Sequence, residues 1–282
     1  MRTKCAKTWH PFPDHVGKTV IGSAPVSVLF QKPHAEIVFA ANAREKRMKP
    51  SSARTKAKVE LARLLFGNWT GKRFPAQDGC LRISAKMGRP PQVATSFWGQ
   101  PLLFLSGHID PSISFSHLGK VTWAALCMDQ YSVGIDAATS LDFSKGYPYQ
   151  RVFHPDEFNN FIDRYESREK AAAALWSAKE AVVKALGCDY GLLEPLDLRV
   201  TYSANSEDGE PFFISFAERA MKRLPWITQE WVEVRIFQQE TLFVSVALES
   251  SSGMSFFSVP SVDLRFTSST YRRTPASCEP QR

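Results

Sequence analysis

Cysteine is scarce and scattered in this chain of 282 residues. The five cysteines lie far apart, and no CxxC pair occurs among them. An odd number of cysteines at such spacings disfavours a disulfide framework or a zinc ribbon. We therefore expect reduced thiols and a cytoplasmic location.

Long apolar runs are also missing. No stretch approaches the roughly 20 apolar residues that span a bilayer, and the first residues carry positive charge without an apolar core. We therefore expect neither a membrane span nor a secretory signal. With 44% hydrophobic and 22% charged residues, the composition excludes collagen-like, coiled-coil and wholly disordered chains. One large domain or two packed subdomains both fit this length.

Three common catalytic signatures are absent. There is no G-x-S-x-G elbow, since Leu105-Ser106-Gly107-His108 lacks the first glycine, and neither HExxH nor a P-loop occurs. The sequence gives no support to a serine hydrolase, a zinc metalloprotease or a P-loop nucleotidase.

The balance of charge is basic. Lys and Arg number 35 against 28 Asp and Glu, which leaves a net charge of +7. This surplus favours anionic partners: nucleic acid, phosphorylated cofactors, acidic proteins or anionic lipid. The basic run 44–49 keeps a nucleic-acid-binding module open as an alternative, although no zinc-finger spacing, RNP-like aromatic motif or glycine clamp supports it.

Hydrophobic patterning predicts an α+β chain. Helices are expected from Ser51 or Ser52 to about residue 65, over 154–166, and over 168–186 with Ser167 as N-cap and Gly187 as stop. The predicted strands are 26–30, 36–41, 81–84, 102–105, 112–115, 121–128, 132–135, 196–202, 212–216, 231–237 and 242–248. We expect strands 121–128 and 132–135 to form a hairpin through Asp129-Gln130.

The same patterning divides the chain into four parts. Residues 1–24 are expected to be an irregular lead-in, 25–118 and 119–250 two similar subdomains, and 251–282 a loosely ordered tail rich in Ser, Thr, Pro and Arg.

Several polar residues stand out at the ends of these elements. Asp136 ends the apolar strand Val133-Gly134-Ile135-Asp136, although Asp is a common turn residue there. Trp176, Glu180 and Lys184 recur every four residues and share one helix face, where a Glu–Lys pair alone would mean only an exposed ion pair. His117 follows a short strand, and such a histidine by itself means little.

Taken together and in order, these motifs resemble those of the Sfp-type 4′-phosphopantetheinyl transferase family. Asp136 and Glu180 are 44 residues apart, as in that family, and the likeness covers roughly residues 25–250. The matching motifs are Gly88-Arg89-Pro90, Ser114-Phe115-Ser116-His117, Val133-Gly134-Ile135-Asp136 and Trp176-Ser177-Ala178-Lys179-Glu180-Ala181-Val182-Val183-Lys184-Ala185-Leu186-Gly187.

The resemblance implies a reaction and a fold. Members of the family transfer the 4′-phosphopantetheine arm of coenzyme A to a serine of an acyl or peptidyl carrier protein, release adenosine 3′,5′-bisphosphate and require Mg²⁺. The implied fold has two similar α/β subdomains related by a pseudo-two-fold axis, with coenzyme A in the cleft between them. An acidic carrier protein would suit the charge of +7, and the cleft within one chain suggests a monomer.

The resemblance also implies roles for individual residues. Asp136 and Glu180 would hold Mg²⁺ and act in catalysis, with Glu180 accepting the proton of the carrier serine. Lys184 would contact the phosphates and support the leaving group. Four further residues would bind the coenzyme A phosphates: Arg54, Arg89, Ser116 and His117.

Two positions depart from the family pattern. Many members have a further acidic metal ligand two residues after the strand Asp, where this chain has Ala138, and Arg89 replaces the usual lysine. Arg keeps the charge of Lys, whereas Ala138 removes a carboxylate. The loss keeps open a second reading, a catalytically weak member that binds coenzyme A or a carrier protein.

Overall fold

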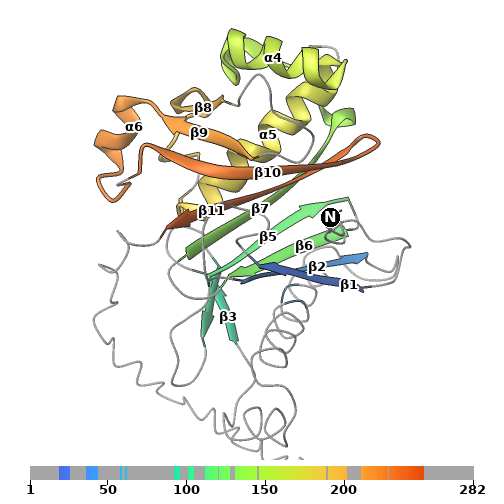
Figure 1. Ribbon diagram of the computed structural model, residues 1–282, viewed down its shortest axis with the longest axis vertical. Coiled ribbons are helices and arrows are strands. Elements are labelled where there is room, and N and C mark those ends of the chain that lie inside the picture. Colours follow the sequence, from blue (N-terminus) through green and yellow to red (C-terminus); the bar gives the residue numbers. More distant parts are fainter. Residues whose placement is uncertain are drawn as a thin grey trace, which may run out of the picture.

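The structure is a computed structural model that describes residues 19–25, 36–43, 58, 61, 92–95, 101–104, 112–119, 121–127, 131–144, 146–188, 190–201, 211–227 and 229–250. Helices and strands are mixed, which confirms the α+β class. The described chain forms three layers: helices, a five-stranded sheet and a four-stranded sheet (Figure 1). No helix within these residues is both long and apolar enough to cross a membrane.

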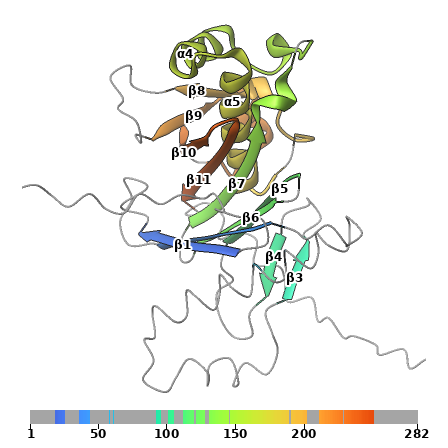
Figure 2. The same ribbon diagram turned by 90° about the vertical axis from the view of Figure 1, so that its right-hand side faces the viewer.

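The five-stranded sheet is antiparallel and runs in the order β7-β11-β10-β9-β8. Its strands are β7 (Tyr131–Thr139), β8 (Leu198–Thr201), β9 (Phe212–Phe216), β10 (Trp231–Gln239) and β11 (Leu242–Ser250). Helices α4 (Pro155–Tyr165) and α5 (Arg168–Ala185) lie on its outer side (Figure 2), and the short α6 (Glu218–Arg223) follows β9.

The four-stranded sheet has the order β1-β2-β6-β5 and is also antiparallel. Its strands are β1 (Thr19–Pro25), β2 (Glu36–Ala43), β5 (Ser112–Leu118) and β6 (Val121–Cys127). A separate two-stranded ribbon joins β3 (Gln92–Thr95) to β4 (Pro101–Phe104).

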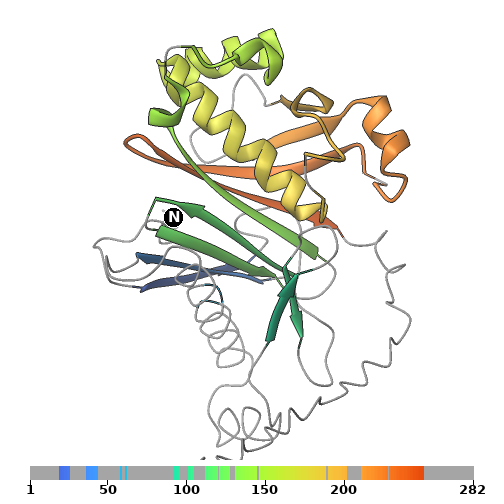
Figure 3. The ribbon, with the colours of Figure 1, turned by 180° about the vertical axis from the view of Figure 1, so that it is seen from behind.

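Helix α5 crosses the back of the five-stranded sheet and packs against β7 and β11 (Figure 3). Its N-terminus is capped as predicted, because the Ser167 hydroxyl accepts the backbone N–H of Lys170, and Gly187 follows its end with a positive φ of 68°. Small side chains on the helix, including the fully buried run Ala171–Ala174, allow its backbone to approach the sheet closely.

Strand β7 lies at the centre of the molecule. All of residues 132–138 are buried, because one face of the strand meets α5 and the other meets the apolar side chains of β6. Trp123, Ala125 and Cys127 of β6 pack against Val133, Ile135 and Ala137 of β7. A strand covered on both faces shows little polar–apolar alternation, which explains why the sequence around Asp136 is so uniformly apolar.

The expected hairpin between residues 121–128 and 132–135 is wrong. β6 pairs with β2 and β5, whereas β7 pairs with β11 in the other sheet. The change of sheet therefore falls between Cys127 and Tyr131, and the expected division at residue 118 lies inside the β5–β6 hairpin. Strong strand patterns on both sides of a short connection predicted the strands but not their partners.

Most other elements agree with the sequence. The predictions for 36–41, 102–105, 112–115, 154–166, 168–186, 212–216, 231–237 and 242–248 each coincide with an observed element to within a few residues. β1 occupies the end of the segment expected to be irregular, and β3 and α6 were not predicted. The predicted strands 26–30 and 81–84 and the tail 251–282 lie outside the described residues.

Candidate active site

The candidate site forms where α5 crosses β7, and Gly134 makes that crossing possible. A β-carbon at Gly134 would lie 1.8 Å from the carbonyl oxygen of Ala181 and 2.6 Å from the backbone nitrogen of Ala185. Only glycine permits this approach of helix backbone to strand backbone. Two residues further along the same face of β7, Asp136 is therefore brought against the helix turn that ends in Lys184.

The other edge of β7 is held by serine side chains. The hydroxyls of Ser112, Ser114 and Ser116 on β5 accept the backbone N–H groups of Val133, Ile135 and Ala137 at 2.9, 3.1 and 3.0 Å. Because the three serines alternate along β5, they share one face of that strand. They satisfy an edge that would otherwise present unpaired donors, and they join the two sheets beside Asp136.

Asp136 is buried and accepts two hydrogen bonds on one oxygen. Its Oδ1 accepts the hydroxyl of Ser116 at 2.8 Å and Lys184 Nζ at 2.6 Å. Lys184 also donates to the carbonyl oxygen of Ile135 at 3.3 Å, while its side chain keeps 28% of its surface exposed. The structure thus brings together three of the predicted site residues: Ser116, Asp136 and Lys184.

Glu180 lies one helical turn before Lys184, on the same face of α5. Burial and, next, the negative charge of Asp136 raise the pKa of Glu180 to about 7, against the opposing positive charge of Lys184. A carboxyl group with a pKa near neutrality is suited to accept a proton and later release it. The effect of Asp136 on the pKa of Glu180 indicates that the two predicted carboxylates lie near each other.

The donor set can be compared with the needs of Mg²⁺. This ion prefers oxygen ligands and is commonly held by one or two carboxylates, with substrate phosphate and water completing the shell. Within the described ranges no group of three or more His, Cys, Asp or Glu side chains is placed to hold a metal. Asp136 and Glu180 nevertheless fit the two-carboxylate case, because a cation between them would relieve the repulsion that raises the pKa of Glu180.

Ala138, where the resemblance would place a third acid, lies on the same face of β7 as Asp136. It is buried in the apolar cluster between that sheet and α5, with 5% of its surface exposed. The third carboxylate is therefore replaced by apolar packing.

The residue before Glu180 anchors the helix. Lys179 is fully buried, and its Nζ donates to Glu157 Oε1 of α4 at 2.5 Å and to the carbonyl oxygens of Pro195 and Val152 at 3.0 and 3.2 Å. Burial lowers the pKa of Lys179, against the opposing charge and hydrogen bond of Glu157. This satisfied ion pair fixes the rotation of α5, and with it the direction of Glu180.

The structure describes two of the four residues that were predicted to bind the coenzyme A phosphates, His117 and Ser116. His117 belongs to β5, where its Nδ1 lies 2.8 Å from the hydroxyl of Thr122. Arg54 and Arg89 lie outside the described residues, so their roles stay predictions. The Ser116 hydroxyl accepts the backbone N–H of Ala137 and donates to Asp136. These bonds favour a role in holding Asp136, in addition to the predicted contact with coenzyme A.

Sequence reasoning missed Tyr190. It follows α5 closely, its ring centroid lies 5.3 Å from that of Trp176, and its pKa is affected by Glu180 and Asp136. Nothing in the motif spacing marks this residue. The alternation of Ser112, Ser114 and Ser116 was a usable signal for the serine contacts, since three serines on one face of a buried strand need partners.

A family match agrees with this geometry. Residues 132–233 match the family model described as the 4′-phosphopantetheinyl transferase superfamily. The matched stretch contains β7, α4 and α5, and therefore Asp136, Glu180 and Lys184. The match covers 102 of the 282 residues, and it agrees with the predicted family and with an enzyme. The Sfp-type subdivision stays a prediction.

Solved structures give more distant likenesses. Holo-[acyl-carrier-protein] synthase from Neisseria meningitidis is 17% identical, covers 41% of this chain and 94% of its own, and has a TM-score of 0.35. The complex of Chronobacterium ammoniagenes ACPS with CoA is 22% identical, with coverage of 43% and 96% and a TM-score of 0.34. Among curated proteins no match is found. The family match, not these likenesses, supports the assignment.

Proposed function

We propose that this protein transfers the 4′-phosphopantetheine group of coenzyme A to a serine of an apo acyl or peptidyl carrier protein. The observation that carries the proposal is the meeting of Asp136, Glu180 and Lys184 at the crossing of β7 and α5, with Lys184 Nζ 2.6 Å from Asp136 Oδ1. Two acidic groups and one basic group, one of them from β7 and two from α5, lie within a matched transferase stretch and suit the displacement of one phosphate ester by another.

The proposed step is a nucleophilic displacement at phosphorus. The carrier serine oxygen attacks the phosphorus on the pantetheine side of the pyrophosphate, and the bond to the bridging oxygen breaks. The serine proton passes to Glu180, which lies one helical turn before Lys184 on the same face of α5. Adenosine 3′,5′-bisphosphate leaves with the bond electrons, and its new charge is stabilised by Lys184.

Asp136 and Glu180 are the residues that would hold Mg²⁺. When bound, the cation supplies positive charge to the pyrophosphate oxygens. Ser116 would keep Asp136 in place through its 2.8 Å hydrogen bond. The partial exposure of Lys184 leaves its ammonium group room to move from Asp136 to a phosphate.

We also propose that a single chain supplies the whole site, as a monomer. Asp136, Glu180 and Lys184 all come from the same chain, and β5 of the four-stranded sheet lies against β7 beside them. The expected cleft between two similar subdomains would then lie along this β5–β7 junction, with His117 on its β5 side.

The test is intact-mass spectrometry of apo carrier proteins from fatty-acid, polyketide and non-ribosomal peptide systems. Each is incubated with the protein, coenzyme A and Mg²⁺, with EDTA as the metal-free control. We expect one carrier class to gain the mass of one phosphopantetheine, and Glu180→Gln to abolish the gain. Glu169→Gln is the matched control on the same helix, because Glu169 lies in the first turn, where its carboxylate accepts the Ser167 hydroxyl at 2.8 Å.

The buried Ala138 favours a second candidate, a member that binds coenzyme A without efficient transfer. It lacks one of the charges that would hold the cation. Tight binding of coenzyme A together with no mass gain on any carrier class would support this candidate and refute the first.

A further inference from the structure

Tyr190 lies beside the candidate site, and within the described part of the chain its hydroxyl group forms no hydrogen bond. The Tyr190 ring is 5.3 Å from the Trp176 ring between centroids, and Trp176 precedes Glu180 by one turn on the same face of α5. The hydroxyl oxygen is buried and has no hydrogen-bond partner among the described residues. A buried hydroxyl in this state destabilises the folded protein unless a ligand or water supplies the partner.

The electrostatic surroundings of Tyr190 agree with its position. Its pKa is raised well above the ordinary value, first by burial and then by the negative charges of Glu180 and Asp136. The phenol therefore keeps its proton at neutral pH and is a hydrogen-bond donor. Both carboxylates of the site affect the pKa of Tyr190, so its hydroxyl lies near the two groups that would hold a cation.

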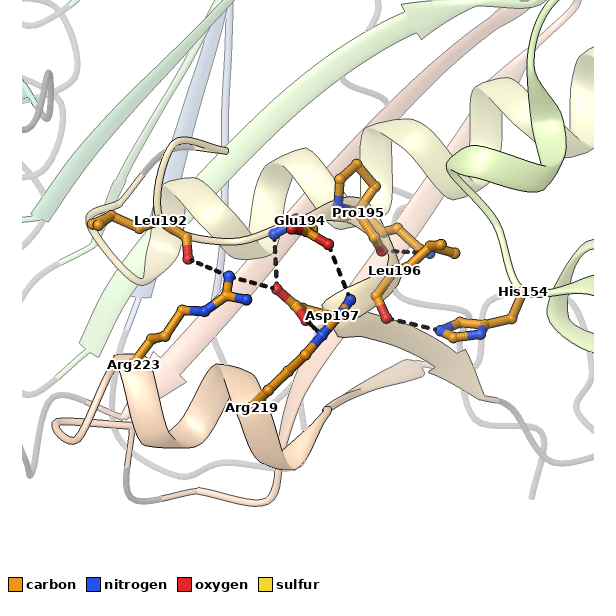
Figure 4. Close-up of polar contacts among 9 residues, drawn as sticks. His154, Leu192, Glu194, Pro195, Leu196, Asp197, Arg219 and Arg223 are labelled. Carbon is orange, nitrogen blue, oxygen red and sulfur yellow. Dashed lines mark hydrogen bonds and ion pairs between the residues drawn. The ribbon is translucent and has the colours of Figure 1, made fainter.

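An ion-pair cluster ties the segment that follows Tyr190 to α6 (Figure 4). Arg223 of α6 donates to the carbonyl oxygen of Leu192 at 3.5 Å, and both Arg223 and Arg219 contact the fully buried carboxylate of Asp197. The backbone N–H of Glu194 also donates to Asp197, at 2.9 Å. The turn after α5 is thus tied to α6 within two residues of Tyr190, and its ring is held against Trp176 before any ligand binds.

We infer that Tyr190 is a further ligand-binding residue of this site, and that its hydroxyl donates a hydrogen bond to a phosphate oxygen of the bound phosphopantetheine donor. The inference rests on the proposed function, because it takes coenzyme A as the ligand. A neutral phenol suits this place beside two carboxylates, because it can donate a hydrogen bond to a phosphate oxygen without adding a negative side chain to the site.

The test compares two tyrosine variants in the full chain. In Tyr190→Phe the folded protein loses an unsatisfied hydroxyl, whereas Tyr149→Phe loses a hydroxyl that donates to the carbonyl oxygen of Phe143 at 2.6 Å. Dissociation constants for coenzyme A with Mg²⁺ are measured by calorimetry, and the Tm of each free protein by calorimetric scanning.

We expect opposite responses. Tyr190→Phe should weaken coenzyme A binding about 10- to 100-fold, the range for a bond to a charged acceptor, while the Tm of the free protein stays at or above that of the wild type. Tyr149→Phe should lower the Tm and leave the affinity unchanged.

The outcomes separate the two proposals. If the wild type and Tyr190→Phe bind coenzyme A equally, the role of Tyr190 is refuted while the proposed function stands. If Tyr190→Phe weakens binding only together with a large fall in Tm, its hydroxyl is structural and the inference is also overturned. If the wild type does not bind coenzyme A, the proposed function fails and the inference fails with it.

Discussion

Replacing Gly134 with alanine should damage both the fold and the site, because this glycine sets the distance between β7 and α5. The added β-carbon would lie 1.8 Å from the Ala181 carbonyl oxygen, whereas ordinary contacts begin at 3.4 Å. The helix must therefore withdraw by about 1.6 Å at this point. Since the colliding atoms belong to helix backbone, no change of side-chain rotamer relieves them.

The cost can be estimated from this displacement. Inserting a methyl group into a packed core usually costs about 1–3 kcal/mol, and a collision with backbone belongs at or above the upper end. A loss of about 3 kcal/mol corresponds to a fall in Tm of about 6–12 °C. Moving Glu180 and Lys184 by more than 1 Å relative to Asp136 should also lower transfer about 100-fold.

Thermal unfolding and carrier-protein transfer would be measured on the same samples, below the Tm of both variants. Gly146→Ala is the matched control: its β-carbon meets nothing within 4 Å, but its φ of 99° strains any other residue. We expect this control to lose about 1–3 kcal/mol of stability with unchanged transfer per folded molecule. Wild-type Tm and transfer in Gly134→Ala would refute the close approach of α5 to β7.

Three further predictions concern the charged and polar groups around this crossing. Without metal, folding raises the pKa of Glu180 from 4.5 to about 7. The wild type should therefore lose up to about 3 kcal/mol of stability relative to Glu180→Gln as pH rises through that interval, as measured by urea unfolding. Lys179→Met leaves the buried Glu157 carboxylate without its ion-pair partner and should cost about 3–5 kcal/mol, whereas the double variant with Glu157→Gln should recover part of this loss. Ser116→Ala removes hydrogen bonds to Asp136 and to a β7 N–H, and it should lower the free energy of unfolding by about 1–3 kcal/mol in the same assay. A loss below about 0.5 kcal/mol would contradict these contacts.

The sequence predicted the two elements that carry the site because their signals are local. Ser167, the alanine run and Gly187 mark the start, body and end of α5, and four-residue spacing places Glu180 and Lys184 on one face. The apolar run before Asp136 likewise indicated a buried strand. Capping and periodicity depend on neighbours in the chain, so they can be read without knowledge of the fold.

What the sequence did not predict depends on partners distant in the chain. β7 was expected to pair with β6, but its neighbour is β11, more than 100 residues later. Tyr190 and the anchoring of Lys179 by Glu157 arise from the packing of separate helices and loops, which no spacing within one motif encodes. In the sequence Gly134 is only one residue of the motif that ends at Asp136, and nothing local indicates the helix that requires a glycine there.

The contact between β5 and β7 explains why the motif around Ser116 and His117 lies in one sheet and the motif around Asp136 in the other. The N–H groups of the β7 edge find serine hydroxyls instead of a neighbouring strand, so β5 and β7 can lie side by side while belonging to different sheets. The last of these serines, Ser116, also binds Asp136. Any relative movement of the two sheets would therefore shift Ser116 relative to Asp136. A ligand bound by His117 of β5 would lie near a carboxylate that the same strand holds in place.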